Sequence, residues 1–379
     1  MLVYLLLFLL TFFSIMFADR LLVSNRSMKK YALFILLILA FVVGMRDMIG
    51  GYDVYVYGEF FDGLSLNDFS NGVYLHQLLF ERGYTLYCYL IHLFSDNRYI
   101  FFFVTSVMSY LLVFKSLKFC KTFILFSLFL FFCKYFLMSF VYVRQFLAMG
   151  VVWLAIPFII KRKFWKFFLI VLLASTLHTS AIVFFPTYFI CIKKLSKRIL
   201  ILGMMFSILL GLTSVIKYLF SFVGSESGLE KVVAYGSTES NSINYFYLFE
   251  SLLLGISIVK CRSNLYSNVD NICLTNVAYC YVCFSFLTMR DATILRLIWY
   301  FIIGFIYVIP KICYYLKNSM PFIKPLVLLY FTLLFFRLLF LWDNGDMIPY
   351  KTFFQNESRN GRWEYLEYDI NYKTDRFYK

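Results

Sequence analysis

The sequence predicts an all-α, polytopic membrane protein, and three features support this prediction. Hydrophobic residues make up 62% of the 379 residues and charged residues only 15%, whereas soluble domains are roughly 45–50% apolar. Lysine, arginine and proline divide the apolar sequence into segments that mostly approach the ~20 residues with which a helix spans a bilayer. The net charge of +15 comes from cations in short loops between these segments. The positive-inside rule explains this pattern better than binding to nucleic acid.

About 12 membrane helices and one shorter helix are predicted along the chain. The first apolar run lacks a basic n-region and a small-residue cleavage site, so it is interpreted as a span and not as a signal peptide. The segment 84–94 has about half the length of a span, which predicts a re-entrant or interfacial helix. The spans are expected at 2–17, 31–45, 98–115, 122–139, 142–160, 165–177, 179–192, 199–222, 243–259, 270–289, 293–310 and 322–341.

Loop charges predict the orientation of these helices. Lysine and arginine dominate one alternating set of loops, which is therefore expected to be cytoplasmic: 20–30, 115–121, 161–166, 193–198, 260–262 and 311–317. The other set carries nearly all the acidic residues. The basic and acidic loops alternate between the two sides only if 84–94 does not cross the membrane. We therefore expect a membrane domain at 1–342, an extracytoplasmic tail at 343–379 and both termini outside. The tail is compatible with a folded, a surface-lying or a disordered segment.

Metal and disulfide chemistry find little support in the sequence. The nine cysteines lie mostly inside apolar runs, and the pair Cys280 and Cys283 has no histidine or second pair beside it, so packing is the better interpretation. No HExxH motif accompanies the three histidines. We expect no metal and no cofactor.

The predicted outer face gathers the ionisable residues that are costly to place at a membrane edge. Arg46 ends the second span, and Gly50-Gly51 and Asp53 follow it. Glu81 opens the short helix, where a helix N-terminus favours negative charge. Arg144 lies a few residues inside a span and His178 at the start of another, while Arg290, Asp291 and Arg296 lie together near one outer end. Outer cations without a metal motif favour an anionic headgroup, most naturally a phosphate or diphosphate.

Structural roles remain open for each of these residues. Arg46 and Arg144 could be arginines whose charge reaches the lipid headgroups. His178 could be a structural histidine at the membrane edge. The tyrosines of the same face could belong to the aromatic belt of the interface.

The order of these motifs resembles the EpsG-like branch of the Wzy-type polysaccharide polymerases. The resemblance covers residues 1 to about 310, and it rests on the order, spacing and common side of the motifs. They are Arg46, Gly50-Gly51-Tyr52-Asp53, Tyr57, Glu81-Arg82-Gly83-Tyr84, Arg144-Gln145 with Ala148, His178-Thr179-Ser180-Ala181, and Arg296 with Tyr300. The family pattern commonly has threonine where this chain has Tyr52. This difference argues against a role for a threonine-sized hydroxyl at that position, but it does not affect Gly51 and Asp53.

The resemblance implies a metal-independent glycosyltransferase of GT-C-like architecture in the bacterial inner membrane. It would join undecaprenyl-diphosphate-linked oligosaccharides into O-antigen, capsule or exopolysaccharide, with a chain-length regulator as a further possible partner. The diphosphate would be bound by arginines, the attacking hydroxyl would be assisted by a base, and tyrosines would contact sugars. The candidates for the base are Asp53, then His178, then Glu81; those for the diphosphate are Arg46, Arg144, Arg290 and Arg296; those for the sugars are Tyr52, Tyr57, Tyr84 and Tyr300. The alternatives are an O-antigen ligase or another lipid-linked glycan transferase, and a lipid-linked glycan flippase, whose charges would line a cavity that reaches both leaflets.

Overall fold

The computed structural model describes residues 1–20, 24–65, 67, 80–213, 243, 245–291, 294–341 and 347–355. These residues are helical apart from turns, caps and a single isolated β-bridge. They divide into two compact units. The first contains Met1–Leu154, Ile170–Thr179 and Lys324–Lys379, and the second contains Ala155–Leu169 and Ser180–Ile323. The predicted all-helical class is confirmed, whereas the boundary between a membrane domain and a tail at residue 342 stays a prediction.

Five helical segments in the described part of the chain are long and apolar enough to cross a membrane. Shorter apolar helices accompany them at Leu2–Met16, Phe164–Leu177 and Thr179–Ile190. The five are Asn25–Gly44, Arg98–Tyr135, Val143–Ile160, Ile294–Leu316 and Ile323–Leu341. A polytopic membrane protein is therefore supported, and the count of 12 spans stays a prediction.

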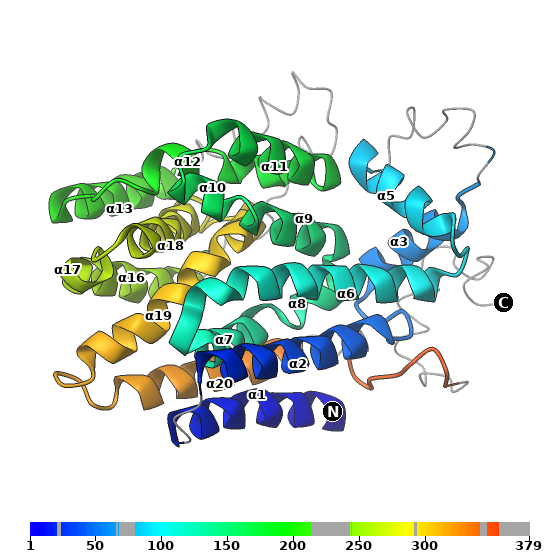
Figure 1. The fold of residues 1–379 in the computed structure, drawn as a ribbon, viewed down its shortest axis with the longest axis horizontal. Coiled ribbons are helices and arrows are strands. Elements are labelled where there is room, and N and C mark those ends of the chain that lie inside the picture. Colours follow the sequence, from blue (N-terminus) through cyan, green and yellow to red (C-terminus); the bar gives the residue numbers. More distant parts are fainter. Residues whose placement is uncertain are drawn as a thin grey trace. The chain divides into compact units, whose positions relative to one another are not determined.

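The first unit is built around two long antiparallel helices, α2 (Asn25–Gly44) and α6 (Arg98–Leu117), which lie side by side (Figure 1). Their opposite directions follow from Tyr99 at the start of α6, whose hydroxyl donates to Asp47 just beyond the end of α2. Lys29 and Lys30 therefore lie at the same end of this unit as the end of α6, away from Asp47. This arrangement agrees with the predicted separation of cationic and acidic loops within the unit.

The remaining helices of the first unit surround this pair. They are α1 (Leu2–Arg20), α3 (Tyr52–Asp62), α5 (Arg82–His92), η2 (Lys118–Phe123), α7 (Ile124–Tyr135), α8 (Met138–Val141), α9 (Val143–Trp153), the last part of α11 (Phe164–Leu177) and α20 (Ile323–Leu341). Every residue of α7 is buried, and phenylalanines join it to α1 and α20: the ring of Phe335 lies 5.6 Å from that of Phe8 and 4.8 Å from that of Phe132. The other face of α20 leaves Leu326, Leu329 and Leu333 exposed, as expected of a helix that faces lipid.

The second unit has the almost wholly buried helix α18 (Val269–Leu287) at its centre. Against it pack α13 (Lys197–Leu212), α16 (Tyr245–Lys260), α19 (Ile302–Leu316) and η4 (Ile294–Phe301). Shorter elements complete the unit: α10 (Ile156–Ile160), η3 (Thr179–Phe184), α12 (Thr187–Ile190) and α17 (Arg262–Leu265).

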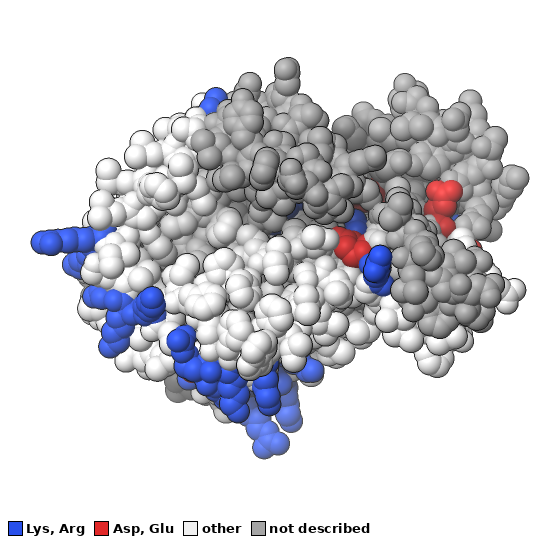
Figure 2. All heavy atoms as spheres, turned by 90° about the horizontal axis from the view of Figure 1, so that it is seen from above, with Lys and Arg blue, Asp and Glu red and all other residues white. Residues whose placement is uncertain are grey.

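Figure 2 shows broad areas of surface without charged side chains between groups of lysines and arginines.

Several predicted helix limits are confirmed, and others are not. The short segment forms the 11-residue helix α5, and helices end beside Phe140 and His178 as expected. The segments 122–139 and 142–160 each contain a turn between two helices, at 136–137 and at 154–155, although the backbone angles there stay helical. Val143–Ile160 still counts as one apolar helical segment. The segment 179–192 begins as a 3₁₀ helix. Residues 214–222 of the predicted span 199–222 lie outside the described residues.

Candidate functional site

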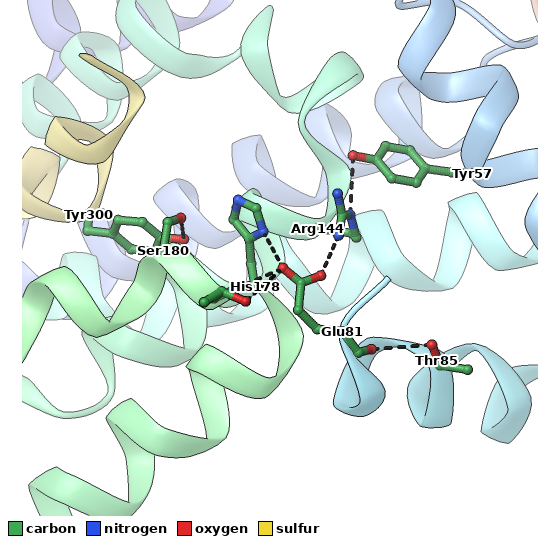
Figure 3. A network of polar contacts seen from close by, with 8 residues as sticks. Tyr57, Glu81, Thr85, Arg144, His178, Ser180 and Tyr300 are labelled. Carbon is green, nitrogen blue, oxygen red and sulfur yellow. Dashed lines mark hydrogen bonds and ion pairs between the residues drawn. The ribbon is translucent and has the colours of Figure 1, made fainter. Parts of the chain in front are cut away.

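Glu81 is the central residue of a polar network in the first unit (Figure 3). Its carboxylate oxygen Oε2 forms an ion pair with Nη1 of Arg144. The other oxygen, Oε1, lies 3.1 Å from Nδ1 of His178 and accepts hydrogen bonds from the backbone N–H of Thr179 at 3.0 Å and its hydroxyl at 3.3 Å. Three residues that the sequence predicts on one face are thus in direct contact, although Glu81 is separated from Arg144 by 63 residues and from His178 by 97.

The start of α5 approaches the end of α11 very closely, and Gly83 permits this approach. A Cβ atom at position 83 would lie 2.3 Å from Oγ1 of Thr176 and 2.7 Å from its backbone oxygen, so no larger residue fits without movement. Helix α11 ends at Leu177 and His178 follows directly. The glycine therefore allows Glu81, the residue before α5, to reach the imidazole.

Arg144 is the second residue of α9, and aromatic rings surround its guanidinium group. The guanidinium carbon lies 4.3 Å from the ring centre of Phe80, 5.5 Å from that of Tyr57 and 5.7 Å from that of Tyr84. Its Nε donates to the Tyr57 hydroxyl at 3.5 Å. Ring faces stabilise a desolvated cation by about 0.5–2 kcal/mol. The side chain of Arg144 keeps 16% exposure, so this cation is fixed in position but still accessible.

The carboxyl group of Glu81 is ionised at neutral pH. Burial opposes its ionisation, but the hydrogen bond from His178, the charge of Arg144 and the hydrogen bond from Thr179 outweigh burial and hold the pKa of Glu81 well below its usual value. A carboxylate with so low a pKa is a weak proton acceptor. The geometry therefore favours Glu81 as a fixed negative charge, and its role as base stays the least supported of the three predictions.

Arg46 has a different environment from Arg144. Its side chain is fully buried, and it donates to the backbone oxygen of Val43 at 2.6 Å and to that of Phe140 at 2.9 Å. The ring of Phe102 lies 4.8 Å from its guanidinium carbon. Burial lowers the pKa of Arg46 to about 10, so the group is still charged at neutral pH. This environment favours a structural role, and its predicted contact with a diphosphate stays a prediction.

The C-terminal segment 347–355 lies against the end of α2 that carries Arg46. The backbone N–H of Asp47 donates to the oxygen of Lys351 at 2.9 Å, and the two side chains form an ion pair at 3.0 Å. The ring of Phe353 stacks on Tyr99 with 4.8 Å between centres. This contact could not be predicted from the sequence, because the segment has no apolar periodicity.

Asp53 lies in the first turn of α3, one turn before Tyr57. Its carboxylate makes no hydrogen bond or ion pair with a residue that the structure describes, and it is partly exposed. Gly51 precedes the helix with φ of 78°, a conformation that favours glycine. The side chain of Tyr52 lies outside the described part. Tyr57 and Tyr84 are buried among other rings, which favours packing over contact with sugars.

The remaining predicted residues belong to the second unit. Arg290 donates from Nη1 to the backbone oxygen of Leu212 at 2.7 Å, and Arg296 lies partly buried in η4. Tyr300, also in η4, is fully buried, and its hydroxyl lies 2.9 Å from that of Ser180. The assignments of Arg290 and Arg296 to a diphosphate and of Tyr300 to a sugar stay predictions.

Two contributors to the network were missed by sequence reasoning. Phe80 is the nearest ring to Arg144, but it adjoins a segment without a recognisable pattern. Thr179 belongs to a motif noted above, yet its backbone N–H gives no signal in a sequence. Among the described residues, no group of three histidine, cysteine or acidic side chains is placed to hold a metal ion, and independence from metals stays a prediction.

Comparisons with known proteins agree with the resemblance that the motifs suggested. No curated protein and no solved structure matches the chain. The model of the EpsG family matches residues 29–352. That match includes Arg46, Asp53, Glu81, Arg144, His178 and Arg296. Because it covers most of the chain, the protein belongs to the EpsG family, a group of membrane proteins with polysaccharide-polymerase character.

Proposed function

We propose that this protein is a polysaccharide polymerase that joins undecaprenyl-diphosphate-linked oligosaccharide repeat units at the outer face of the bacterial inner membrane. One observation carries the proposal beyond family membership: Glu81 holds a cation, Arg144, and an imidazole, His178, at one partly exposed point. Glycosyl transfer from a lipid diphosphate needs a positive group for the departing diphosphate and an acceptor for the proton of the attacking hydroxyl.

The reaction has a simple balance. The hydroxyl oxygen of one repeat unit forms a bond to the anomeric carbon of another, and the bond from that carbon to the diphosphate oxygen breaks. The lipid diphosphate leaves with the bonding electron pair, and the hydroxyl proton passes to a base on the protein. Arg144 is the cation we assign to the leaving diphosphate, because guanidinium groups bind phosphate oxygens through paired N–H donors.

The membrane side follows from the charges of the loops. Glu81 and Asp53 belong to the predicted extracytoplasmic set, whereas the lysine-rich loops belong to the cytoplasmic set. The proposed substrates are therefore lipid-linked units that already face outward. The bilayer is the second partner, and a protein that regulates chain length is a further one; no nucleic acid is expected.

A deletion strain tests the proposal and separates it from its nearest rival. Gels of surface glycan should show single repeat units in place of a ladder, and the undecaprenyl-linked pool should contain only single units. If the protein were a ligase, the deletion strain would instead accumulate undecaprenyl-linked polymer, because polymerisation on the lipid would continue. An unchanged ladder would refute the polymerase. Restoration by the wild-type gene, but not by Arg144→Ala at equal protein amount, would tie polymer formation to the site.

A further inference from the structure

The imidazole of His178 is oriented by its neighbours. Its Nδ1 lies 3.1 Å from Oε1 of Glu81, and the other oxygen of the same carboxylate pairs with Arg144. An ionised carboxylate can only accept hydrogen bonds. Nδ1 must therefore carry the proton when the imidazole is neutral, and the lone pair then resides on Nε2.

The side chain of His178 is accessible in this orientation. Its exposure is 25%, which exceeds that of Arg144 and of Glu81. Glu81 has little capacity to accept a further proton or hydrogen bond, because its two oxygens already accept hydrogen bonds from Arg144, His178 and both donors of Thr179. Of the two side chains, His178 is therefore the more exposed, and Glu81 is the one that already accepts several hydrogen bonds.

We propose that His178 is the proton acceptor of the transfer reaction and that Glu81 is the residue that positions it. This inference rests on the proposed polymerase function. As the attacking oxygen bonds to the anomeric carbon, its proton passes to Nε2, and the imidazole becomes an imidazolium ion. Glu81 stabilises that ion through Nδ1, as a buried carboxylate does beside other catalytic histidines. The proton leaves to solvent after the diphosphate has departed.

The competing base is Asp53, which sequence reasoning ranks first. Asp53 is partly exposed, and its carboxylate has no hydrogen-bond partner among the described residues of the first unit, so none of those residues fixes its direction. A proton acceptor works best when a second group holds it in place. Glu81 holds His178 in place in this way. The structure therefore favours His178 over Asp53 as the base, whereas sequence reasoning ranks Asp53 first.

Two substitutions at position 178 separate the chemical role from a structural one. In His178→Asn the amide nitrogen can occupy the place of Nδ1 and still donate to Glu81, but nothing replaces Nε2. In His178→Gln the amide instead reaches toward the place of Nε2, and the contact with Glu81 is lost. If His178 served only the fold, the asparagine variant would keep the wild-type rate.

The assay uses the full-length protein in lipid vesicles with an undecaprenyl-diphosphate-linked repeat unit, and it measures initial rates of polymer formation from pH 5 to 9. We expect His178→Asn to lower kcat by about 10²–10⁴-fold with an unchanged melting temperature. Glu81→Gln should lower kcat without raising KM, and the acid limb of its pH profile should move to lower pH, because the imidazolium loses its negative neighbour. The other described titratable groups that interact with this network are left intact in these variants; they are Arg144, Tyr57, Tyr84, Cys88 and Asp53.

Glu59→Gln is the matched control, since it removes the same charge from an exposed position on α3. Its rate and pH profile should equal those of the wild type. A wild-type rate in His178→Asn, together with loss of activity in Asp53→Asn, would overturn the assignment of His178 and leave the polymerase function intact. A wild-type protein that forms no polymer from the lipid-linked unit would overturn both.

Discussion

Substitution of Gly83 by alanine tests whether the close approach of α5 to α11 creates the site. The new Cβ would lie 2.3 Å from Oγ1 of Thr176, whereas ordinary contact begins at 3.4 Å, so the helix must retreat by about 1 Å. The contacts of Glu81 with His178 and Thr179, now 3.1 and 3.0 Å, would then exceed the range of a hydrogen bond.

The expected loss of stability is smaller than the expected loss of activity. Overpacking costs about 1–3 kcal/mol, and alanine recovers up to about 1 kcal/mol relative to glycine in a helix. The net destabilisation is therefore roughly 0–3 kcal/mol. A displacement of about 1 Å in a reacting group can lower a rate by about 10²-fold. The rate per folded molecule should fall much more than the amount of protein.

The assay compares polymer length and initial rate with the protein amount in the membrane. Gly255→Ala is the control, because its Cβ would meet the sulfur of Met204 at 2.4 Å, and a methionine side chain can move aside. This variant should keep the wild-type rate per molecule. Wild-type activity in Gly83→Ala, or a loss that only follows protein amount in both variants, would refute the reasoning.

Three further predictions address the charges of the first unit. Arg46→Lys should lower the melting temperature, with a cost of about 1–3 kcal/mol from a lost bond to a buried carbonyl, and keep its rate per molecule. Arg144→Lys should instead lower the rate per molecule and keep the melting temperature. Identical behaviour of the two variants would contradict the assignment of a structural role to Arg46 and a functional role to Arg144. The pKa of Glu81 is lowered by folding, so its contribution to stability is complete above the unfolded value of about 4.3 and is lost as pH falls further. The melting temperatures of wild type and Glu81→Gln should therefore stay apart from pH 8 to 5 and converge only below about pH 4, and convergence already at pH 6 would exclude the lowered pKa. Lys351→Ala breaks an ion pair whose partners are 17% and 20% exposed, so it should cost less than about 1 kcal/mol and leave polymer length unchanged, and a loss of polymer would indicate that the C-terminal segment takes part in the reaction.

The helix positions were largely predictable, because each depends on nearby residues. Asn97 and Ser196 accept hydrogen bonds from the first turns of α6 and α13, where the apolar runs were expected to begin. The shortness of α5 was predictable, because the apolar segment 84–94 has only about half the length of a membrane span. The turns inside 122–139 and 142–160 were not predictable, because apolar residues continue through them and the backbone angles there stay helical.

The candidate site was predictable as a set of residues, but not as a set of contacts. Charge at the ends of apolar runs identified Glu81, Arg144 and His178, since such placement is costly without a function. The same argument selected Arg46, whose guanidinium donates to two backbone carbonyls. The carbonyl of Phe140 that receives its guanidinium is 94 residues away, and a sequence holds no record of such a partner.

The charge of the network explains why this arrangement suits the departure of a diphosphate. Arg144 and Glu81 neutralise each other, so the group carries no net charge while His178 is neutral. Proton transfer to His178 makes the group positive at the same stage at which negative charge develops on the leaving diphosphate. A site that becomes positive only during the reaction binds the transition state more strongly than the substrate, which is the condition for catalysis. By this reasoning Glu81→Gln changes more than an orientation. It leaves Arg144 with an uncompensated charge, so the variant should bind the lipid diphosphate more tightly than the wild type while it turns over more slowly. Tighter product inhibition by undecaprenyl diphosphate in Glu81→Gln is therefore expected, and inhibition weaker than in the wild type would contradict the charge argument.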